Sequence, residues 1–310
     1  QGDRSGWSVS LSADGNTLAV GARQDDSSGN RSGSTQIFTW NGTAWDQLGS
    51  DIDGEAADDE SGYSVSLSAN GTTVAIGARR NDGNGNSSGH TRIYSWNGTA
   101  WNQLGSDIDG EAADDESGYS VSLSANGTTV AIGARRNDGN GNSSGHTRIY
   151  SWNGTAWNQL GSDIDGEAAN DFSGISISLS NDGNTVAIGA HKNDGNGSKS
   201  GHARIYNWDG TTWSQLGNDI DGEASDDESG FSVSLAGNGT VVAVSAHQND
   251  GNGTNAGHTR IYTWNGTTWN QLGNDIDGEA ANDESGYSVA ISNDGNTVAI
   301  GARLNDGNGT

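Results

Sequence analysis

The chain has 310 residues, and its 40 acidic residues against 14 lysines and arginines give it a formal net charge of −26 at pH 7. This charge would repel phosphates, so it excludes nucleic acid as a natural partner and favours cations. Cysteine is absent, which excludes disulfides and thiolate metal sites, and no apolar run reaches the length of a membrane span.

A single repeat organises the sequence. Trp7, Tyr63 and Tyr119 lie 56 residues apart, and residues 51–106 are identical to residues 107–162. A fixed period of this length is typical of propellers and solenoids. The chain therefore divides into the repeats 5–60, 61–116, 117–172, 173–228 and 229–284, followed by a partial repeat 285–310.

The repeat that begins at Ser61 predicts four short strands. Apolar residues alternate with small or polar residues in them, and no segment keeps a helical period. The four strands are residues 63–68, 72–78, 90–96 and 99–105. Asn70-Gly71 and Asn97-Gly98 join them in pairs and predict two-residue type I′ turns, which need positive φ at both positions.

Such turns would fix the pairing of the strands. The predicted pairs are Tyr63 with Ala78, Val65 with Ile76, Leu67 with Val74, and Tyr94 with Trp101, with Trp96 diagonal to Trp101. One face of the first hairpin is bulky and the other is small, so stacked sheets could bury both faces. We predict an all-β fold, a single β-propeller of four-stranded antiparallel blades over residues 1–310. It would hold five full blades and a partial sixth, as part of a six- or seven-bladed ring; a linear array of β units or an open solenoid is the alternative.

The stretch SGYSVSLSANGTTVAIGARRNDGNGNSSGHTRIYSWNGTAW, residues 61–101, resembles the FG-GAP repeat of integrin α-subunit propellers and of many bacterial and algal surface proteins. The resemblance extends over the whole chain. It implies a propeller, usually of seven blades, in an extracellular protein that binds other molecules. Ser61 stands where the family usually has Phe, and Arg79 where it usually has Pro. The family's calcium loop is replaced by the short turn SANGTT, so its calcium site is not carried over.

Acidic residues gather in two loops of each repeat that should emerge at the same end of the sheet. One is the connection DIDGEAADDESG (51–62), which recurs with few changes, and the other is RRNDGNGNSSG (79–89). Calcium prefers six to eight oxygen ligands, and these loops could supply them. The candidate calcium ligands are Asp51, Asp53, Asp58, Asp82, Asp107, Asp109, Asp114, Asp138, Asp163, Asp165, Asp171 and Asp194. Solvation of the surface and hydrogen bonds within the turns are two alternative roles for the same acids.

Tryptophans and histidines recur once or twice per repeat. A sugar-stacking platform is one role for the tryptophans that precede the second turn, and packing between blades is the other. These tryptophans are Trp40, Trp96, Trp152, Trp208 and Trp264. His90, His146, His202 and His258 start the third strand of their repeats. A propeller would spread them around a ring, so we expect a hydrogen-bonding role at the strand edge instead of a shared metal centre.

These patterns predict a non-catalytic repeat protein, extracellular or on a cell surface, that serves adhesion, recognition or structural assembly as a module of a larger protein. A multivalent carbohydrate-binding lectin is the alternative, and a glycan-active enzyme is third, because five near-identical loops suit repeated binding better than one asymmetric active site. Expected partners are other surface proteins, glycans or copies of the chain itself. The chain ends inside a repeat, and an open strand edge there could pair with another copy to form a filament.

Overall fold

The computed structural model of the chain describes residues 2–307, and these residues form strands and turns without a helix. Gln1 and residues 308–310, at the two ends of the predicted domain, lie outside the described residues. The chain forms two compact units, Gln1–Asn137 with Thr147–Asp163 and Asp138–His146 with Ile164–Thr310. No helix in the described part is long and apolar enough to cross a membrane.

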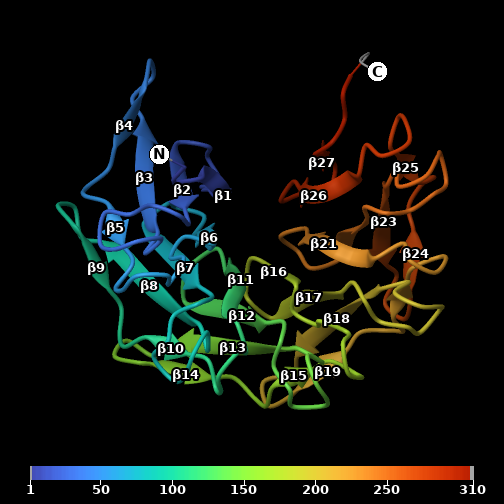
Figure 1. Ribbon diagram of the computed structural model, residues 1–310, viewed down its shortest axis with the longest axis horizontal. Coiled ribbons are helices and arrows are strands. Elements are labelled where there is room, and N and C mark those ends of the chain that lie inside the picture. The colour runs from blue at the N-terminus through green and yellow to red at the C-terminus, as the bar shows by residue number, and fades with distance from the viewer. Residues whose placement is uncertain (1, 308–310) are drawn as a thin grey trace. The chain divides into compact units, whose positions relative to one another are not determined.

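The strands follow the 56-residue period (Figure 1). The first repeat contains β1 (Ser5–Leu11), β2 (Thr17–Ala22), β3 (Ser34–Trp40), β4 (Trp45–Gln47) and β5 (Ile52–Asp53). The second contains β6 (Ser64–Leu67), β7 (Thr73–Ala78), β8 (His90–Trp96), β9 (Trp101–Gln103) and β10 (Ile108–Asp109). The third contains β11 (Ser117–Leu123), β12 (Thr129–Ala134), β13 (His146–Trp152), β14 (Trp157–Gln159) and β15 (Ile164–Asp165). The fourth contains β16 (Ser176–Leu179), β17 (Thr185–Ala190), β18 (His202–Trp208), β19 (Trp213–Gln215) and β20 (Ile220–Asp221). The fifth contains β21 (Ser229–Leu235), β22 (Val241–Ala246), β23 (His258–Trp264), β24 (Trp269–Gln271) and β25 (Ile276–Asp277), and the partial sixth contains β26 (Ser285–Ile291) and β27 (Val298–Ala302).

Each full repeat forms an antiparallel sheet of the kind that makes a propeller blade. In the first repeat the order is β1-β2-β3-β4, with β5 paired to β3. The four predicted strands of each repeat are therefore confirmed. The fifth strand of each repeat was not predicted, because the acidic connection that contains it shows no strand pattern. Ile52 within it is 6% exposed and pairs with Thr35, so one buried β-branched side chain turns the start of the connection into a short strand.

The register of the first hairpin is confirmed near its turn and wrong at its far end. Leu67 pairs with Val74 as predicted, but Ser64, not Tyr63, is the first paired residue of β6. The third repeat shows the cause, since its register shifts between Ser117 and Ser120 at a bulge. Gly118, within this shift, and Gly62, its counterpart in the second repeat, both have φ 80°. Glycine adopts this conformation without strain, and it lets the chain bulge.

The second hairpin differs from its prediction by two residues. Trp96 pairs directly with Trp101, and Tyr94 pairs with Gln103. The turn therefore contains four residues, from Asn97 to Ala100, of which only the glycine has positive φ. The Asn97 side-chain oxygen accepts hydrogen bonds from the N–H groups of Thr99 and Ala100 at 2.8 and 2.9 Å. Asparagine acts here through its side chain and not through a left-handed backbone.

Within each of the two units, the core lies between the sheets of successive repeats. Val65, Leu67 and Ile76 of the second repeat pack with Ala19 and Ile37 of the first. The predicted contact of a bulky face with a small-residue face is therefore observed. Each fully buried aliphatic side chain contributes about 1.5–3 kcal/mol, so stability comes from stacking more than from any one sheet.

Candidate functional site

The acidic connection between repeats is an ordered segment. Asp59 and Glu60 are 3% and 1% exposed, and both have defined partners. Asp59 accepts hydrogen bonds from the Ala56 N–H at 3.0 Å and from the Asn81 side chain at 3.1 Å. Burial raises the pKa of Asp59, and these two hydrogen bonds oppose the rise. Part of the acidity therefore supports the connection itself, as the turn-bonding alternative predicted.

Glu60 lies among arginines of two repeats. Its carboxylate is 3.0 Å from Arg23 Nη1, 2.9 Å from Arg79 Nη2 and 3.2 Å from Arg31 Nη2. Burial alone would raise the pKa of Glu60, but the guanidinium groups of Arg79 and Arg23 outweigh burial and lower the pKa below its usual value. The Arg79 guanidinium also lies 4.1 Å from the centre of the Tyr63 ring. The Glu60 carboxylate thus joins arginines of two successive repeats.

The predicted calcium ligands fall into different environments. Asp82, Asp138 and Asp194 each accept a backbone N–H from five residues later, at 2.7–2.8 Å. Asp51 accepts side-chain amides of Gln36 and Gln47. Three more carboxylates accept hydrogen bonds from side-chain amides: Asp114 from Asn86, Asp163 from Gln159 and Asp171 from Asn193. Asp58 lies 3.5 Å from Arg31, Asp107 faces His90, and the backbone carbonyl of Asp165 accepts a hydrogen bond from Arg204. Burial raises the pKa of Asp53 and of Asp109. Calcium binding by these residues stays a prediction.

A small pocket recurs beside the connection. The first has a volume of about 350 Å³ and lies between Gly49–Asp53 and the side chains of Tyr94 and Trp101. Its equivalents measure about 450 Å³, beside Tyr150 and Trp157, and about 330 Å³, beside Tyr262 and Trp269. Each pocket thus combines an indole, a phenol ring and two carboxylates.

The structure places the second tryptophan of each pair, not the first, in the lining of these pockets. Trp101 donates its indole N–H to the Leu48 carbonyl of the preceding repeat at 2.8 Å. Trp96 packs against Trp101, with ring centres 5.5 Å apart, and is half-buried. Of the predicted stacking residues, Trp40 is 40% exposed, and Trp152, Trp208 and Trp264 are half-buried. No sequence pattern predicted which tryptophan lines the pocket, because this depends on the register of the second hairpin.

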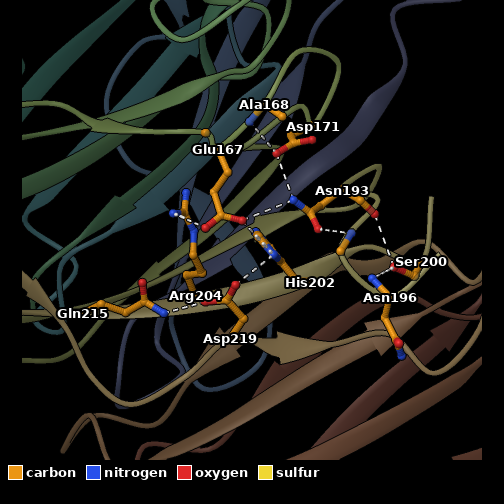
Figure 2. A network of polar contacts seen from close by, with 12 residues as sticks. Glu167, Ala168, Asp171, Asn193, Asn196, Ser200, His202, Arg204, Gln215 and Asp219 are labelled. Carbon is orange, nitrogen blue, oxygen red and sulfur yellow. Dashed lines mark hydrogen bonds and ion pairs between the residues drawn. The ribbon is translucent and has the colours of Figure 1, made fainter. Parts of the chain in front are cut away.

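A histidine between two carboxylates forms a second cluster, shown in Figure 2. His202 begins β18 and is 1% exposed. Its Nδ1 lies 3.8 Å from Glu167 and 3.6 Å from Asp219, which come from two successive acidic connections. Neither ring nitrogen has a hydrogen-bond partner. Burial, together with the nearby Arg204, lowers the pKa of His202, so the ring is neutral at pH 7.

The other oxygen of each carboxylate is held in place. Glu167 Oε1 lies 3.5 Å from Arg204 Nη1, and Asp219 Oδ1 accepts the Gln215 side-chain amide at 2.6 Å. Glu167 Oε2, which faces the histidine, also has the Asn193 amide at 3.4 Å (Figure 2). Each acid therefore points one fixed oxygen at the imidazole.

The same arrangement recurs around His90 and His258. His90 Nδ1 lies 3.8 Å from Glu55 and 3.7 Å from Asp107, and His258 Nδ1 lies 3.6 Å from Asp275. Arginine and glutamine again hold the outer oxygens: Arg92 and Gln103 around His90, and Arg260 and Gln271 around His258. The histidines start their strands as predicted, but the expected hydrogen bonds are absent from His90, His202 and His258. Nothing in the sequence indicated that acids of two connections converge on each ring.

The chain matches known proteins by repeat and by fold. A family model described as the FG-GAP repeat matches residues 1–38, 51–94, 107–150, 163–206 and 276–310. No curated protein matches the sequence. A solved structure assigned as a 6-phosphogluconolactonase from Bacteroides uniformis is 11% identical, with a TM-score of 0.51, over 88% of this chain and 85% of its own. One assigned as TolB from Agrobacterium tumefaciens is 14% identical, with a TM-score of 0.51, over 94% of this chain and 88% of its own. At such identities the likeness concerns the fold alone.

Proposed function

Since the chain belongs to the FG-GAP repeat family, we propose that it is a non-catalytic recognition module that acts outside the cell or at the cell surface, in adhesion or assembly. The observation that carries this proposal is the recurrence of one pocket, with the same kinds of residue, from repeat to repeat. Repeated equivalent sites gain avidity for repeated ligands, which is what adhesion requires. Other surface proteins and further copies of the chain are the partners that we expect.

The absence of catalysis in this proposal rests on the same repetition. An active site usually combines different groups with separate roles, whereas these pockets repeat one set of carboxylates and aromatic rings. Glycoside hydrolysis is the reaction that paired carboxylates such as Asp51 and Asp53 could serve. We expect no release of chromophore from a panel of aryl glycosides, and turnover that is lost in Asp53→Asn would contradict the proposal.

Carbohydrate is the ligand class that the pocket lining favours as a second candidate. The indole of Trp101 and the ring of Tyr94 offer apolar faces, while Asp53 and Thr99 offer hydrogen-bond groups. The negative charge of the pocket favours neutral or amino sugars over sulfated ones. A single open pocket of this size would bind weakly, and several together would bind through avidity.

A glycan array with the full chain tests this ligand class. The pocket variant combines Asp53→Asn, Asp109→Asn and Asp221→Asn, and the matched control combines Asp58→Asn, Asp114→Asn and Asp226→Asn. Both remove three charges from the same connections, but only the first set lines the pockets. We expect at least a tenfold loss of array binding in the pocket variant and little change in the control. Equal binding by both variants would reject the pockets as the glycan site.

A further inference from the structure

His90, His202 and His258, which begin β8, β18 and β23, lack the hydrogen-bond partners that a buried polar ring normally has. Buried polar groups are almost always hydrogen-bonded, and leaving one unpaired costs about 1–3 kcal/mol. Both nitrogens of His90, His202 and His258 are without a hydrogen bond, although each ring is 1% exposed. Nδ1 of each ring instead faces carboxylate oxygens at non-bonding distance. A ligand between Nδ1 and these carboxylate oxygens would satisfy Nδ1 and the oxygens together.

We propose that each of these Glu–His–Asp clusters binds one divalent transition-metal ion, with zinc as its first candidate, through histidine Nδ1 and one oxygen of each carboxylate. In the cluster of Figure 2 the ligands are Glu167, His202 and Asp219. Two further clusters to which the proposal applies are Glu55 with His90 and Asp107, and Glu223 with His258 and Asp275. The proposal does not depend on the recognition function, because it concerns different side chains from those that give the pockets their apolar walls.

The spacing of the three groups suits such an ion. Zinc binds histidine nitrogen and carboxylate oxygen at about 2.0–2.2 Å in tetrahedral geometry, which sets neighbouring ligand atoms about 3.4 Å apart. The His202 nitrogen lies 3.8 Å and 3.6 Å from the two facing oxygens. A closing movement of a few tenths of an ångström would bring these two distances to the tetrahedral value, and all three ligand atoms already lie within 4.8 Å of one another. Three protein ligands would leave a fourth position for water or a ligand atom.

The surrounding groups resemble the outer shell of a metal site. Ligand side chains are normally oriented by hydrogen bonds to their outer atoms, and these bonds raise metal affinity. Arg204 and Gln215 contact the outer oxygens of Glu167 and Asp219, so the inner oxygens face His202. The clusters around His90 and His258 repeat this division of roles with their own arginine and glutamine.

The first repeat shows what happens without the histidine. Ser34 and Gln36 stand there in place of the histidine and the arginine of later repeats. Asp51, the counterpart of Asp107, accepts the Gln36 amide at 3.1 Å with the oxygen that would face a histidine. A protein amide thus satisfies this carboxylate where no metal ligand set exists.

The donor set also indicates the class of metal. Calcium and magnesium prefer all-oxygen sites, whereas imidazole suits zinc, nickel, copper and cobalt. The clusters therefore differ in metal class from the calcium site predicted from the aspartates alone, although Asp107 belongs to both sets of residues. Asp219 also lines the third pocket, so a metal here would lie next to the proposed recognition surface.

Zinc titration of the chelator-treated full chain, followed by isothermal calorimetry, tests the proposal. We expect micromolar or tighter binding, and one zinc fewer per chain in Glu167→Gln and in His202→Asn. Asp226→Asn is the matched control, because it removes one charge from the connection that also supplies Asp219, at a side chain that lies 3.7 Å from Lys199 and is outside the clusters. Bound cobalt should give visible d–d absorption, and the absorbance per chain should fall by the contribution of one site in Glu167→Gln and in His202→Asn.

Three outcomes would overturn the proposal. The first is no zinc binding by the wild-type chain, and the second is an unchanged zinc stoichiometry in Glu167→Gln. The third is calcium binding that Glu167→Gln and His202→Asn abolish, in a chain whose clusters do not bind zinc. Should His202→Asn fail to fold, Glu167→Gln decides alone, because its side chain is 45% exposed and its replacement keeps the same size. Circular dichroism and thermal unfolding of each variant establish that it is folded.

Discussion

At the scale of single residues, Glu60 shows how this acidic chain keeps a buried charge. Its carboxylate lies within 3.2 Å of three arginines, and its side chain is 2% exposed. Breaking a buried ion pair from one side leaves the partner charge uncompensated and costs about 3 kcal/mol. We therefore expect Glu60→Gln to lower the free energy of unfolding at pH 7 by about 3 kcal/mol, measured by urea unfolding with tryptophan fluorescence.

The pH dependence of this effect follows from the lowered pKa of Glu60. The ordinary glutamate pKa in an unfolded chain is about 4.3. A group with a lower pKa in the folded state stabilises the fold fully above that pH and loses its contribution as the pH falls through its folded pKa. The difference between wild type and Glu60→Gln should therefore shrink below about pH 4.3. Asp58→Asn, at a side chain 60% exposed, is the control; a loss at Asp58 as large as at Glu60 would contradict this account.

The limits of sequence reasoning also show at the residue scale. The histidine position was recognisable from its recurrence at the start of the third strand. Its acidic partners were not, because Glu167 and Asp219 lie in two different connections that only the folded sheets bring together around His202. A repeated motif shows which residues recur, but convergence across repeats is a property of the packing.

At the scale of elements, Gly49 controls how closely neighbouring sheets approach. Its φ is 84°, and a Cβ built on it would lie 2.8 Å from Trp96 and 3.0 Å from Trp101 of the next repeat. Gly42 has a similar φ of 96° but nothing within 4 Å of such an atom. Both Gly→Ala changes carry the left-handed backbone penalty of about 1–2 kcal/mol, and only Gly49→Ala adds an overpacking cost of about 1–3 kcal/mol.

We expect Gly49→Ala to lower the thermal midpoint clearly further than Gly42→Ala. Differential scanning calorimetry of both variants measures the difference, and the matched backbone conformation makes it a measure of packing between sheets. Equal midpoints would show that the tryptophans move aside without cost. In that case the close approach of Gly49 would not explain why glycine stands there.

The elements themselves were largely predictable. Alternation of apolar with small or polar residues, strict only in residues 63–68, and the Asn-Gly turns together identified the four main strands. The two-residue β5 was not predictable, since one isoleucine among acids does not make a pattern. The second register failed because Asn-Gly was assigned a type I′ turn, whereas Asn97 uses its side chain to hold a four-residue turn. That error placed Tyr94 opposite Trp101 and hid which tryptophan lines the pocket.

At the scale of the whole molecule, the net charge of −26 opposes folding through self-repulsion. Salt shortens the range of this repulsion to a Debye length of about 8 Å at physiological ionic strength. We therefore expect the melting temperature to rise with sodium chloride and then to level off.

Carboxylates that already accept hydrogen bonds from backbone N–H groups, as Asp82 and Asp138 do, have less need of a calcium ion. At matched ionic strength, millimolar calcium chloride should give the same melting temperature as sodium chloride. A calcium-specific rise that a chelator reverses would instead establish the predicted calcium sites, because an ion that binds only the folded chain stabilises it by mass action.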